Sequence, residues 1–150
     1  MPKIVAVIGA AEAQPELREQ AFAVGCAIAE QGATLICGGR GGVMEAAARG
    51  ARTVGGHTIG VLPTYDRADA NPYIEFVIAT GMGHARNVII VASADAVIAL
   101  AGEGGTLSEI GLALKLGRPV VAIEAWREIR QVRRAIDPAA AVELALHLAR

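Results

Sequence analysis

Two glycine-rich segments of this 150-residue sequence have the composition of a binding site for a charged ligand. One is Gly38-Gly39-Arg40-Gly41-Gly42, and the other runs from Ala101 to Gly105. Each follows an apolar run typical of a buried parallel strand and precedes a helical pattern. Glycine has no Cβ, so backbone N–H groups can approach a ligand, and the start of a helix adds free N–H donors and a positive dipole end. The two segments therefore predict anion sites, most often for phosphate.

The spacing of these glycines differs from two common nucleotide motifs. No Gly-Lys-Ser/Thr is present, and residues 38–42 lack Gly-x-Gly-x-x-Gly, so neither ATP hydrolysis nor NAD chemistry is favoured. Arg40 stands between four glycines, which offer little apolar surface for its side chain to lie along. We therefore interpret Arg40 as a cation that faces the ligand.

Glu109 and Arg86 each have two interpretations. Thr106-Leu107-Ser108-Glu109 has the spacing of a capping box, in which Glu109 would bond the backbone N–H of Thr106. Alternatively, Glu109 is a working carboxylate of the site that the glycines form. Arg86 is either a charge on the solvent face of a helix, as lone arginines usually are, or a guanidinium that holds a phosphate. The spacing alone leaves these alternatives open.

The second glycine segment also resembles a known signature. That signature, Pro-Gly-Gly-x-Gly-Thr-x-x-Glu, is typical of the Lonely Guy superfamily, whose enzymes resemble nucleoside 5′-monophosphate phosphoribohydrolases. The resemblance extends along nearly the whole chain, which most resembles the branch that includes the molybdenum cofactor carrier proteins. The matching residues are Gly102, Gly105, Thr106 and Glu109.

Several positions depart from the family pattern. In the loop, Ala101 replaces the proline and Glu103 replaces the second glycine, which adds a carboxylate. Asn87 replaces the lysine of the enzymes' Met-His-x-Arg-Lys segment, and Ser108 replaces the first glutamate of their Glu-Glu pair. The sequence thus lacks two groups of the enzymes' site, which favours binding over catalysis.

The resemblance implies two working residues, Arg86 and Glu109. In the enzymes, the glutamate that matches Glu109 acts on the N-glycosidic bond, where a carboxylate can stabilise the ribosyl cation and help activate water. The arginine that matches Arg86 would hold a phosphate or polarise the leaving base. No lysine of this sequence lies in a motif for pyridoxal phosphate, so the lysine decarboxylase activity often attached to the family finds no support.

Two functions of different classes follow from these residues. The first is a binding protein for a nucleotide-type or phosphorylated pterin ligand, resembling the molybdenum cofactor carriers, with the molybdenum cofactor or a nucleotide as bound ligand and no required cofactor. The alternative is a phosphoribohydrolase, which splits a nucleoside monophosphate into base and ribose 5-phosphate. The ligand-binding residues expected for both are Gly9, Gly39, Arg40, Gly42, Gly102, Gly104, Gly105 and Thr106.

Short apolar runs alternate with helical patterns and predict one α/β domain over residues 1–150. We expect a Rossmann-like doubly wound parallel sheet between helix layers, with the loops that follow the strands meeting at one crevice. Residues 63–72 predict a loop that could act as a lid, and residues 129–135 an edge strand or a helical turn. Asp137 predicts the N-cap of a last helix. Strands are expected at residues 4–8, 33–37, 57–62, 75–79, 96–100 and 119–123.

Composition and charge narrow the range of partners. The sequence is 53% hydrophobic but 3% aromatic, which predicts a core of Ala, Val, Ile and Leu. A net charge of -1 with scattered basic residues predicts a small-molecule partner rather than nucleic acid. Cys26 and Cys37 form no motif, and no cluster of His, Cys and carboxylate residues has metal-ligand spacing, so no metal is expected.

The sequence also predicts a location and an assembly. It has no evident leader peptide and no uninterrupted apolar stretch of the roughly 20 residues that a membrane span needs, so we expect a cytoplasmic protein without membrane partners. The helix expected over residues 105–116 is apolar on nearly every side, and such a helix must be covered on two sides. This predicts a homodimer or homotetramer.

Overall fold

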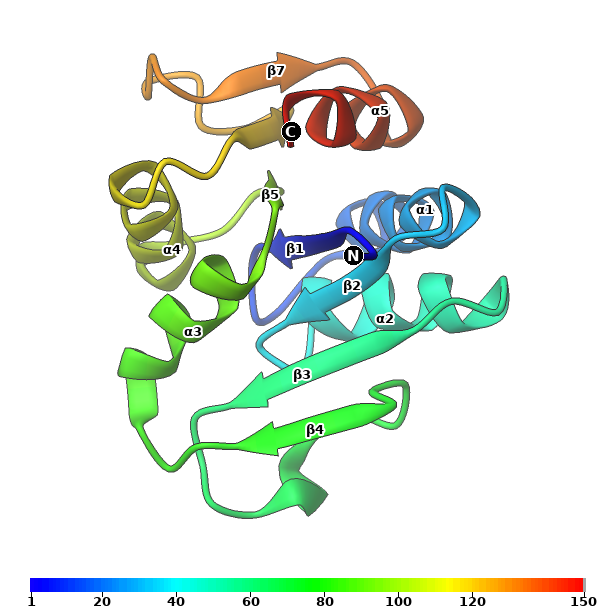
Figure 1. The fold of residues 1–150 in the computed structure, drawn as a ribbon, viewed down its shortest axis with the longest axis vertical. Coiled ribbons are helices and arrows are strands. Elements are labelled where there is room, and N and C mark those ends of the chain that lie inside the picture. The colour runs from blue at the N-terminus through cyan, green and yellow to red at the C-terminus, as the bar shows by residue number, and fades with distance from the viewer. Residues whose placement is uncertain (150) are drawn as a thin grey trace.

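A computed structural model describes residues 1–149 as one seven-stranded parallel sheet between two layers of helices (Figure 1). The strand order is β4-β3-β2-β1-β5-β6-β7, and each neighbouring pair is parallel. The Rossmann-like α/β class predicted from the sequence is confirmed. The strands are β1 (Ile4–Ile8), β2 (Thr34–Cys37), β3 (Thr58–Leu62), β4 (Phe76–Ala79), β5 (Ala96–Ala99), β6 (Val120–Ile123) and β7 (Arg133–Ala135).

The helices divide unequally between the two faces of the sheet (Figure 1). Val5 and Val7 of β1 pack in the cluster of the three-helix layer, and Ala6 and Ile8 in the cluster of the two-helix layer. All four are 0% or 1% exposed, which explains why β1 has no polar residue. The three-helix layer contains α1 (Pro15–Glu30), α2 (Val43–Thr53) and α5 (Pro138–Leu148), and the two-helix layer contains α3 (Arg86–Ser93) and α4 (Gly104–Lys115).

The sheet reverses its winding direction between β1 and β5. The chain runs outward from β1 to β4 and then returns to place β5 against the free side of β1, with Val5 opposite Ala96 and Ile8 opposite Ala99. In open α/β sheets, ligands bind beyond the carboxyl ends of the strands at this reversal. The topology therefore directs attention to the loops after β1 and β5.

The structure shows the conformation of the segments for which the sequence allowed more than one. Of the two alternatives for residues 129–135, the edge strand is correct, because Arg133–Ala135 pairs parallel with β6. The 63–72 loop contains a single 3-10 turn. The carboxylate of Asp137 accepts a hydrogen bond of 2.8 Å from the backbone N–H of Ala140, which confirms the predicted N-cap. Within residues 1–149, no helix has the length and apolar character that crossing a membrane requires.

Glycines let α1 and α2 pack with their backbones almost in contact. A Cβ placed on Gly25 would lie 1.9 Å from the carbonyl oxygen of Ala47, and one placed on Gly50 would lie 2.1 Å from that of Phe22. No real Cβ tolerates such distances, so a larger residue at either position would push the helices apart. The close packing matters for the site because both helices begin at its edge.

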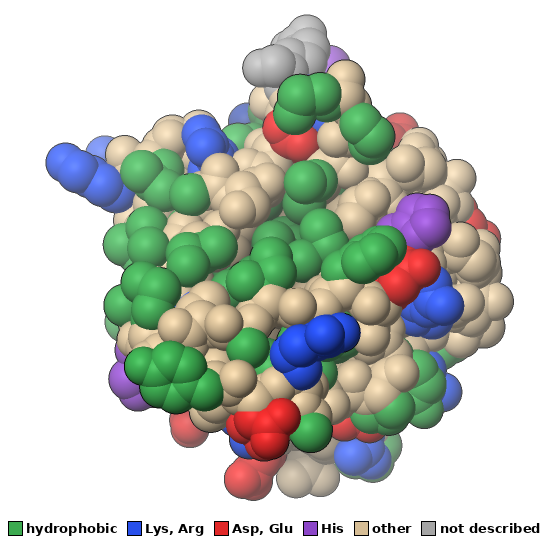
Figure 2. All heavy atoms as spheres, turned by 60° about the horizontal axis from the view of Figure 1, so that its bottom comes forward, with side chains coloured by type: hydrophobic (Ala, Val, Ile, Leu, Met, Phe, Trp, Pro, Cys, Tyr) green, Lys and Arg blue, Asp and Glu red, His purple; other side chains and the backbone are tan. Residues whose placement is uncertain are grey.

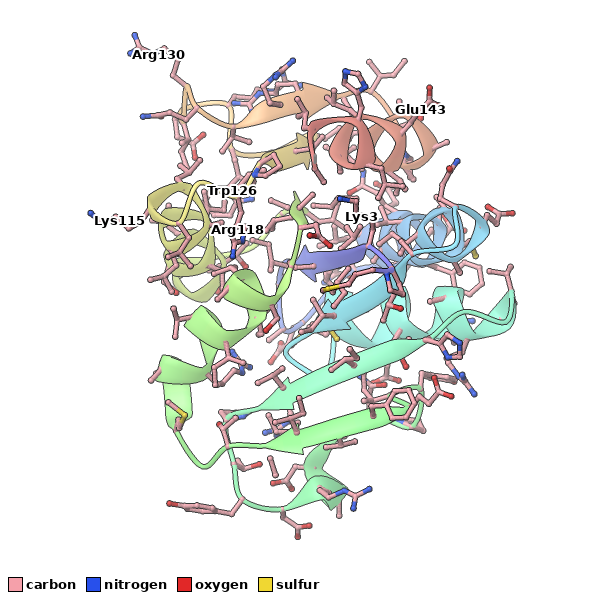
Figure 3. The ribbon with its side chains drawn as sticks, viewed as in Figure 1. Lys3, Lys115, Arg118, Trp126, Arg130 and Glu143 are labelled. Carbon is pink, nitrogen blue, oxygen red and sulfur yellow. The ribbon has the colours of Figure 1, made fainter. Side chains whose placement is uncertain are left out.

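Arg118 and Trp126 make hydrogen bonds that tie neighbouring elements to each other. Arg118, which follows α4, donates to the carbonyl of Ala92 at 2.8 Å and so joins the ends of α3 and α4 (Figure 3). Lys115 and Arg130 extend away from the ribbon in the same view. Trp126 differs, because its indole N–H donates at 2.9 Å to the carbonyl of Leu100, where the second glycine segment begins.

Candidate functional site

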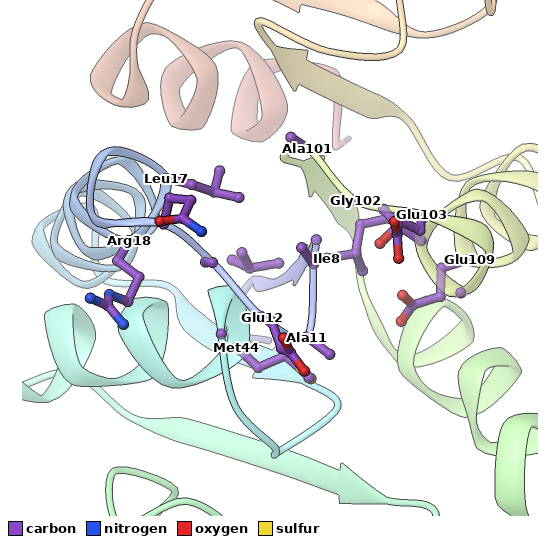
Figure 4. Close-up of a pocket in the computed structure, with 18 of the residues that line it drawn as sticks. Ile8, Ala11, Glu12, Leu17, Arg18, Met44, Ala101, Gly102, Glu103 and Glu109 are labelled. Carbon is purple, nitrogen blue, oxygen red and sulfur yellow. The ribbon is translucent and has the colours of Figure 1, made fainter.

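A cavity of about 1230 Å³ opens at the carboxyl ends of β1 and β5, where the topology predicts a ligand (Figure 4). Its walls come from the loop after β1, the start of α1, the start of α2, the start of α3 and the loop that leads into α4. The volume exceeds the roughly 300–1,000 Å³ typical of small-molecule pockets, so the cavity can enclose a nucleotide-sized ligand.

Three helices have an N-cap residue in the cavity wall that makes no side-chain cap, and α3, whose first two residues also line the cavity, has no side-chain cap either. The N-cap residues of α1, α2 and α4 are Gln14, Gly42 and Glu103, all three line the cavity, and none makes a side-chain cap hydrogen bond. By contrast, α5 begins away from the cavity and is capped by Asp137. The N–H of Val43 at the start of α2 donates to the carbonyl of Ala10, and Pro15 has no N–H, but the remaining N–H groups of these first turns and the positive dipole ends face an anionic ligand without a side-chain cap.

Two of the predicted glycines leave no room for a Cβ, Gly42 because of the loop after β1 and Gly102 because of the first turn of α4. A Cβ on Gly42, which has a φ of 63°, would lie 2.3 Å from the carbonyl oxygen of Ala10. A Cβ on Gly102 would lie 2.2 Å from the hydroxyl of Thr106. Gly105 is different, because a Cβ there would meet no atom within 4 Å. Its position is open space at the cavity wall.

The structure brings most of the predicted site residues together. Gly39, Arg40 and Gly104 are the exceptions, since none of them lines the cavity. Asn71 fixes the backbone of Gly39 and Arg40. Its backbone N–H donates to the carbonyl of Gly39 at 2.9 Å, and its side-chain amide donates to the carbonyl of Arg40 at 2.7 Å. Arg40 is exposed beside the cavity rather than in its wall. The predicted residues that line the cavity are Gly9, Gly42, Arg86, Gly102, Gly105, Thr106 and Glu109.

The sequence analysis missed the start of α1 as a wall of the cavity. Glu12, Gln14 and Arg18 all line it, although none belongs to a glycine segment. A signal was present in the sequence, because Gln14, and not Ser, Thr, Asp or Asn, precedes Pro15, where the structure begins the helix. A helix start that lacks these residues is available to a ligand.

Glu109 is a buried carboxylate whose oxygens have no hydrogen-bond or ion-pair partner within residues 1–149. Its side chain comes from α4 and points into the cavity, with 8% of the residue exposed (Figure 4). Burial raises the pKa of Glu109 to about 7, and the positive charge of Arg86 opposes that rise. Helix α4 begins at Gly104, so Thr106 lies inside it and is no N-cap. The capping-box interpretation of Glu109 is therefore wrong.

Arg86 is a half-buried cation rather than a charge on the solvent face. Its guanidinium lies against Gly38, where a Cβ would be 2.7 Å from Nη2, and its Nε is buried without a partner in the described chain. Burial lowers the pKa of Arg86, and the charge of Glu109 opposes that change. Nη1 donates to the side-chain oxygen of Asn87.

Asn87 on α3 and Ser108 on α4, the two residues that replace the enzymes' lysine and first glutamate, are hydrogen-bonded to each other. The amide nitrogen of Asn87 donates to the hydroxyl of Ser108 at 3.1 Å, and that hydroxyl donates to the carbonyl of Gly105 at 2.8 Å. Asn87 is 3% exposed. A neutral hydrogen-bonded pair thus joins the first turns of α3 and α4 beside the cavity.

The cavity suits a ligand that carries an anionic group and, close to it, a polar group. Free backbone N–H groups and Arg86 suit a phosphate, and the Glu109 carboxyl faces the same space. Within residues 1–149, no three His, Cys, Asp or Glu side chains are grouped as metal ligands.

Comparisons with known proteins show which family and which solved structures this chain is similar to. A sequence model of the SLOG cluster4 family matches residues 2–146. The molybdenum cofactor binding protein of Rippkaea orientalis is 37% identical, with a TM-score of 0.95 over 100% of this chain and 99% of that one. The molybdenum cofactor carrier protein of Chlamydomonas reinhardtii is 34% identical, with a TM-score of 0.89 over 99% and 98%.

An enzyme is also similar in sequence. The cytokinin riboside 5′-monophosphate phosphoribohydrolase of Mycobacterium tuberculosis is 38% identical over 120 residues. The match covers 74% of this chain and 64% of the enzyme. Both relationships anticipated from the second glycine segment are confirmed at the level of the family.

Proposed function

Because the chain belongs to the SLOG cluster4 family, we propose that it binds and carries a phosphorylated pterin or nucleotide-type ligand, with the molybdenum cofactor as its cargo. The observation that carries this proposal is the convergence of three uncapped helix starts on one cavity of about 1230 Å³. Each start supplies N–H donors that no side chain of the described chain uses, and a phosphate is the group that such donors bind best. The similarity to two molybdenum cofactor proteins supports a pterin cargo.

In this proposal the phosphate lies at the start of α4. The backbone N–H groups of Gly105 and Thr106 and the guanidinium of Arg86 hold it, while the ring system of the ligand occupies the space between the loops after β1 and β5. The unpartnered Nε of Arg86 supports this arrangement, because a buried N–H without an acceptor costs free energy that a bound anion would recover.

We also propose that the carrier is a homodimer or homotetramer. The two-helix layer covers β3 but leaves β4 exposed at the edge of the sheet, where Phe76 and Ile78 are 56% and 47% exposed. Leu107 on α4 and Val88 on α3 are exposed in the same layer. Figure 2 shows apolar side chains gathered on one face of the molecule. An apolar surface of this extent supports burial against a second copy of the chain.

Native mass spectrometry of the protein as purified tests cargo and assembly together. We expect two or four subunits of 15.4 kDa, each with the added mass of a molybdopterin or nucleotide. A spectrum with the expected subunit number but no added mass, repeated after incubation with AMP, would contradict the binding proposal. A monomer at micromolar concentration would contradict the assembly.

The second candidate function is hydrolysis of the N-glycosidic bond of a nucleoside monophosphate. One observation favours it: Glu109 is buried, unpartnered and directed into the cavity, as a carboxylate that stabilises a ribosyl cation would be. The loss of the enzymes' lysine and first glutamate, at Asn87 and Ser108, favours the carrier instead.

Incubation with AMP separates the two functions. Under the carrier proposal, the wild-type protein releases no adenine above the uncatalysed background when products are separated by chromatography. Robust release that is lost in Glu109→Gln would overturn the carrier proposal, because the amide keeps the size of the side chain but not the charge that the cation needs. Release that persists in Glu109→Gln indicates a contaminating hydrolase.

A further inference from the structure

Arg86 and Glu109 line the same cavity but do not form an ion pair. Ion pairs within 4.0 Å in the described chain join Glu75 to Arg52 and to His57, at the amino end of the sheet. Yet each of the two cavity residues is the charged group with the largest electrostatic effect on the other. Two opposite charges that share a cavity would gain free energy by pairing. The Arg86 guanidinium instead donates to the side-chain oxygen of Asn87.

The hydrogen bonds around Asn87 restrain the Arg86 guanidinium. They run in one direction, from the Arg86 guanidinium to the Asn87 oxygen, from the Asn87 amide to the Ser108 hydroxyl, and from that hydroxyl to the Gly105 carbonyl. The chemistry of the end groups fixes which partner donates and which accepts, because a guanidinium can only donate a hydrogen bond and a carbonyl can only accept one. Asn87 is 3% exposed, so its amide has little freedom to exchange these partners for water.

We propose that Asn87 is a positioning residue that holds the Arg86 guanidinium apart from the Glu109 carboxylate, so that both remain available to a ligand. A neutral amide is suited to this task. It accepts a hydrogen bond from Arg86 without cancelling the positive charge, whereas a carboxylate in its place would form the ion pair itself. The functional consequence rests on the proposed binding of a phosphate, but the restraint does not.

Titration of Glu109 tests the restraint without any ligand. In Asn87→Ala, Arg86 is released and pairs with Glu109, so the pKa of Glu109 should fall from about 7 to roughly 4–6. Carboxyl signals of ¹³C-labelled glutamate report this pKa by NMR, and Glu109→Gln assigns the signal. Ser108→Ala, at an exposed position, should shift the pKa in the same direction by less.

A matched variant separates positioning from general destabilisation. Thr58 is 0% exposed and hydrogen-bonded at the opposite end of the sheet, where its hydroxyl donates to the carbonyl of Tyr73 at 2.7 Å. Thr58→Val should lower the melting temperature but leave the Glu109 titration unchanged. An unchanged Glu109 pKa in both Asn87→Ala and Ser108→Ala would overturn the proposal.

Ligand binding then tests the consequence. Calorimetry should show AMP affinity falling about tenfold or more in Asn87→Ala, with a smaller change for adenosine, which lacks the phosphate that Arg86 would hold. Equal losses for AMP and adenosine would contradict a role through Arg86. If the wild-type protein bound neither compound, the proposed function would fail, while the Glu109 titration would still decide the role of Asn87.

Discussion

Gly105→Val should abolish AMP binding while leaving the fold intact. The position is open, since outside its own helix turn no atom lies within 4 Å of a Cβ built there, so a valine side chain can occupy the cavity wall at the start of α4. A valine there excludes the phosphate from the backbone N–H groups, and each such charge-assisted hydrogen bond is worth roughly 1.5–3 kcal/mol. Losing two of them corresponds to an affinity loss of about 100-fold or more.

Calorimetric titration with AMP measures this loss, and Gly111→Val provides its control. Gly111 lies on the same helix, is exposed, and also has no atom within 4 Å of a built Cβ, but it does not line the cavity. The Gly111→Val variant should bind AMP like the wild type, and its change in melting temperature should be comparable to that of Gly105→Val. Unchanged affinity in Gly105→Val would refute the phosphate site at the start of α4.

Glu109→Gln should stabilise the protein at alkaline pH and leave it nearly unchanged at acidic pH. The folded state raises the pKa of Glu109 from 4.5 to about 7, so the folded protein binds this proton more readily than the unfolded chain. The free energy of unfolding therefore falls as pH rises from 4.5 to 7 and stays low above that range. At about 1.4 kcal/mol for each pH unit, the loss is roughly 3 kcal/mol. Gln cannot ionise, so the variant escapes it.

Thermal unfolding of both proteins at pH 8 and at pH 4.5 checks the sign and the size of this effect. We expect the melting temperature of Glu109→Gln to exceed that of the wild type by about 6–12 °C at pH 8 and to match it closely at pH 4.5. Glu103→Gln is the control, because that carboxylate lines the same cavity but is exposed. Equal melting temperatures of the wild type and Glu109→Gln at both pH values would mean that burial of the ionised carboxylate does not lower the free energy of unfolding.

The strands could be predicted from the sequence because each is specified by a short run of neighbouring apolar residues. The runs Ile4–Ile8 and Ala96–Ala99 are apolar without interruption, and only a strand covered on both faces explains such short runs. Glycine turns between runs of this kind predicted parallel strands and a crevice at their carboxyl ends. The cavity lies there, because the carboxyl ends of parallel strands necessarily share one edge of the sheet.

Which charged groups face that cavity was decided only by the tertiary structure. Thr106 to Glu109 has the spacing of a capping box, but the N-cap of the helix is Glu103, three residues before Thr106, and Glu109 is a buried carboxylate inside the helix. Arg40, between four glycines, does not line the cavity, and its carbonyl accepts a hydrogen bond from the side chain of Asn71, 31 positions along the chain.

The contact between Asn87 and Ser108 is the clearest case of what the sequence could not specify. The two residues are 21 positions apart and on different helices, and no periodicity relates them. Repeating patterns in a sequence determine the elements and their order, since each depends on neighbouring residues of the chain. The partners of a polar side chain depend on how those elements pack, and burial then sets its charge and its strength as a ligand-binding group.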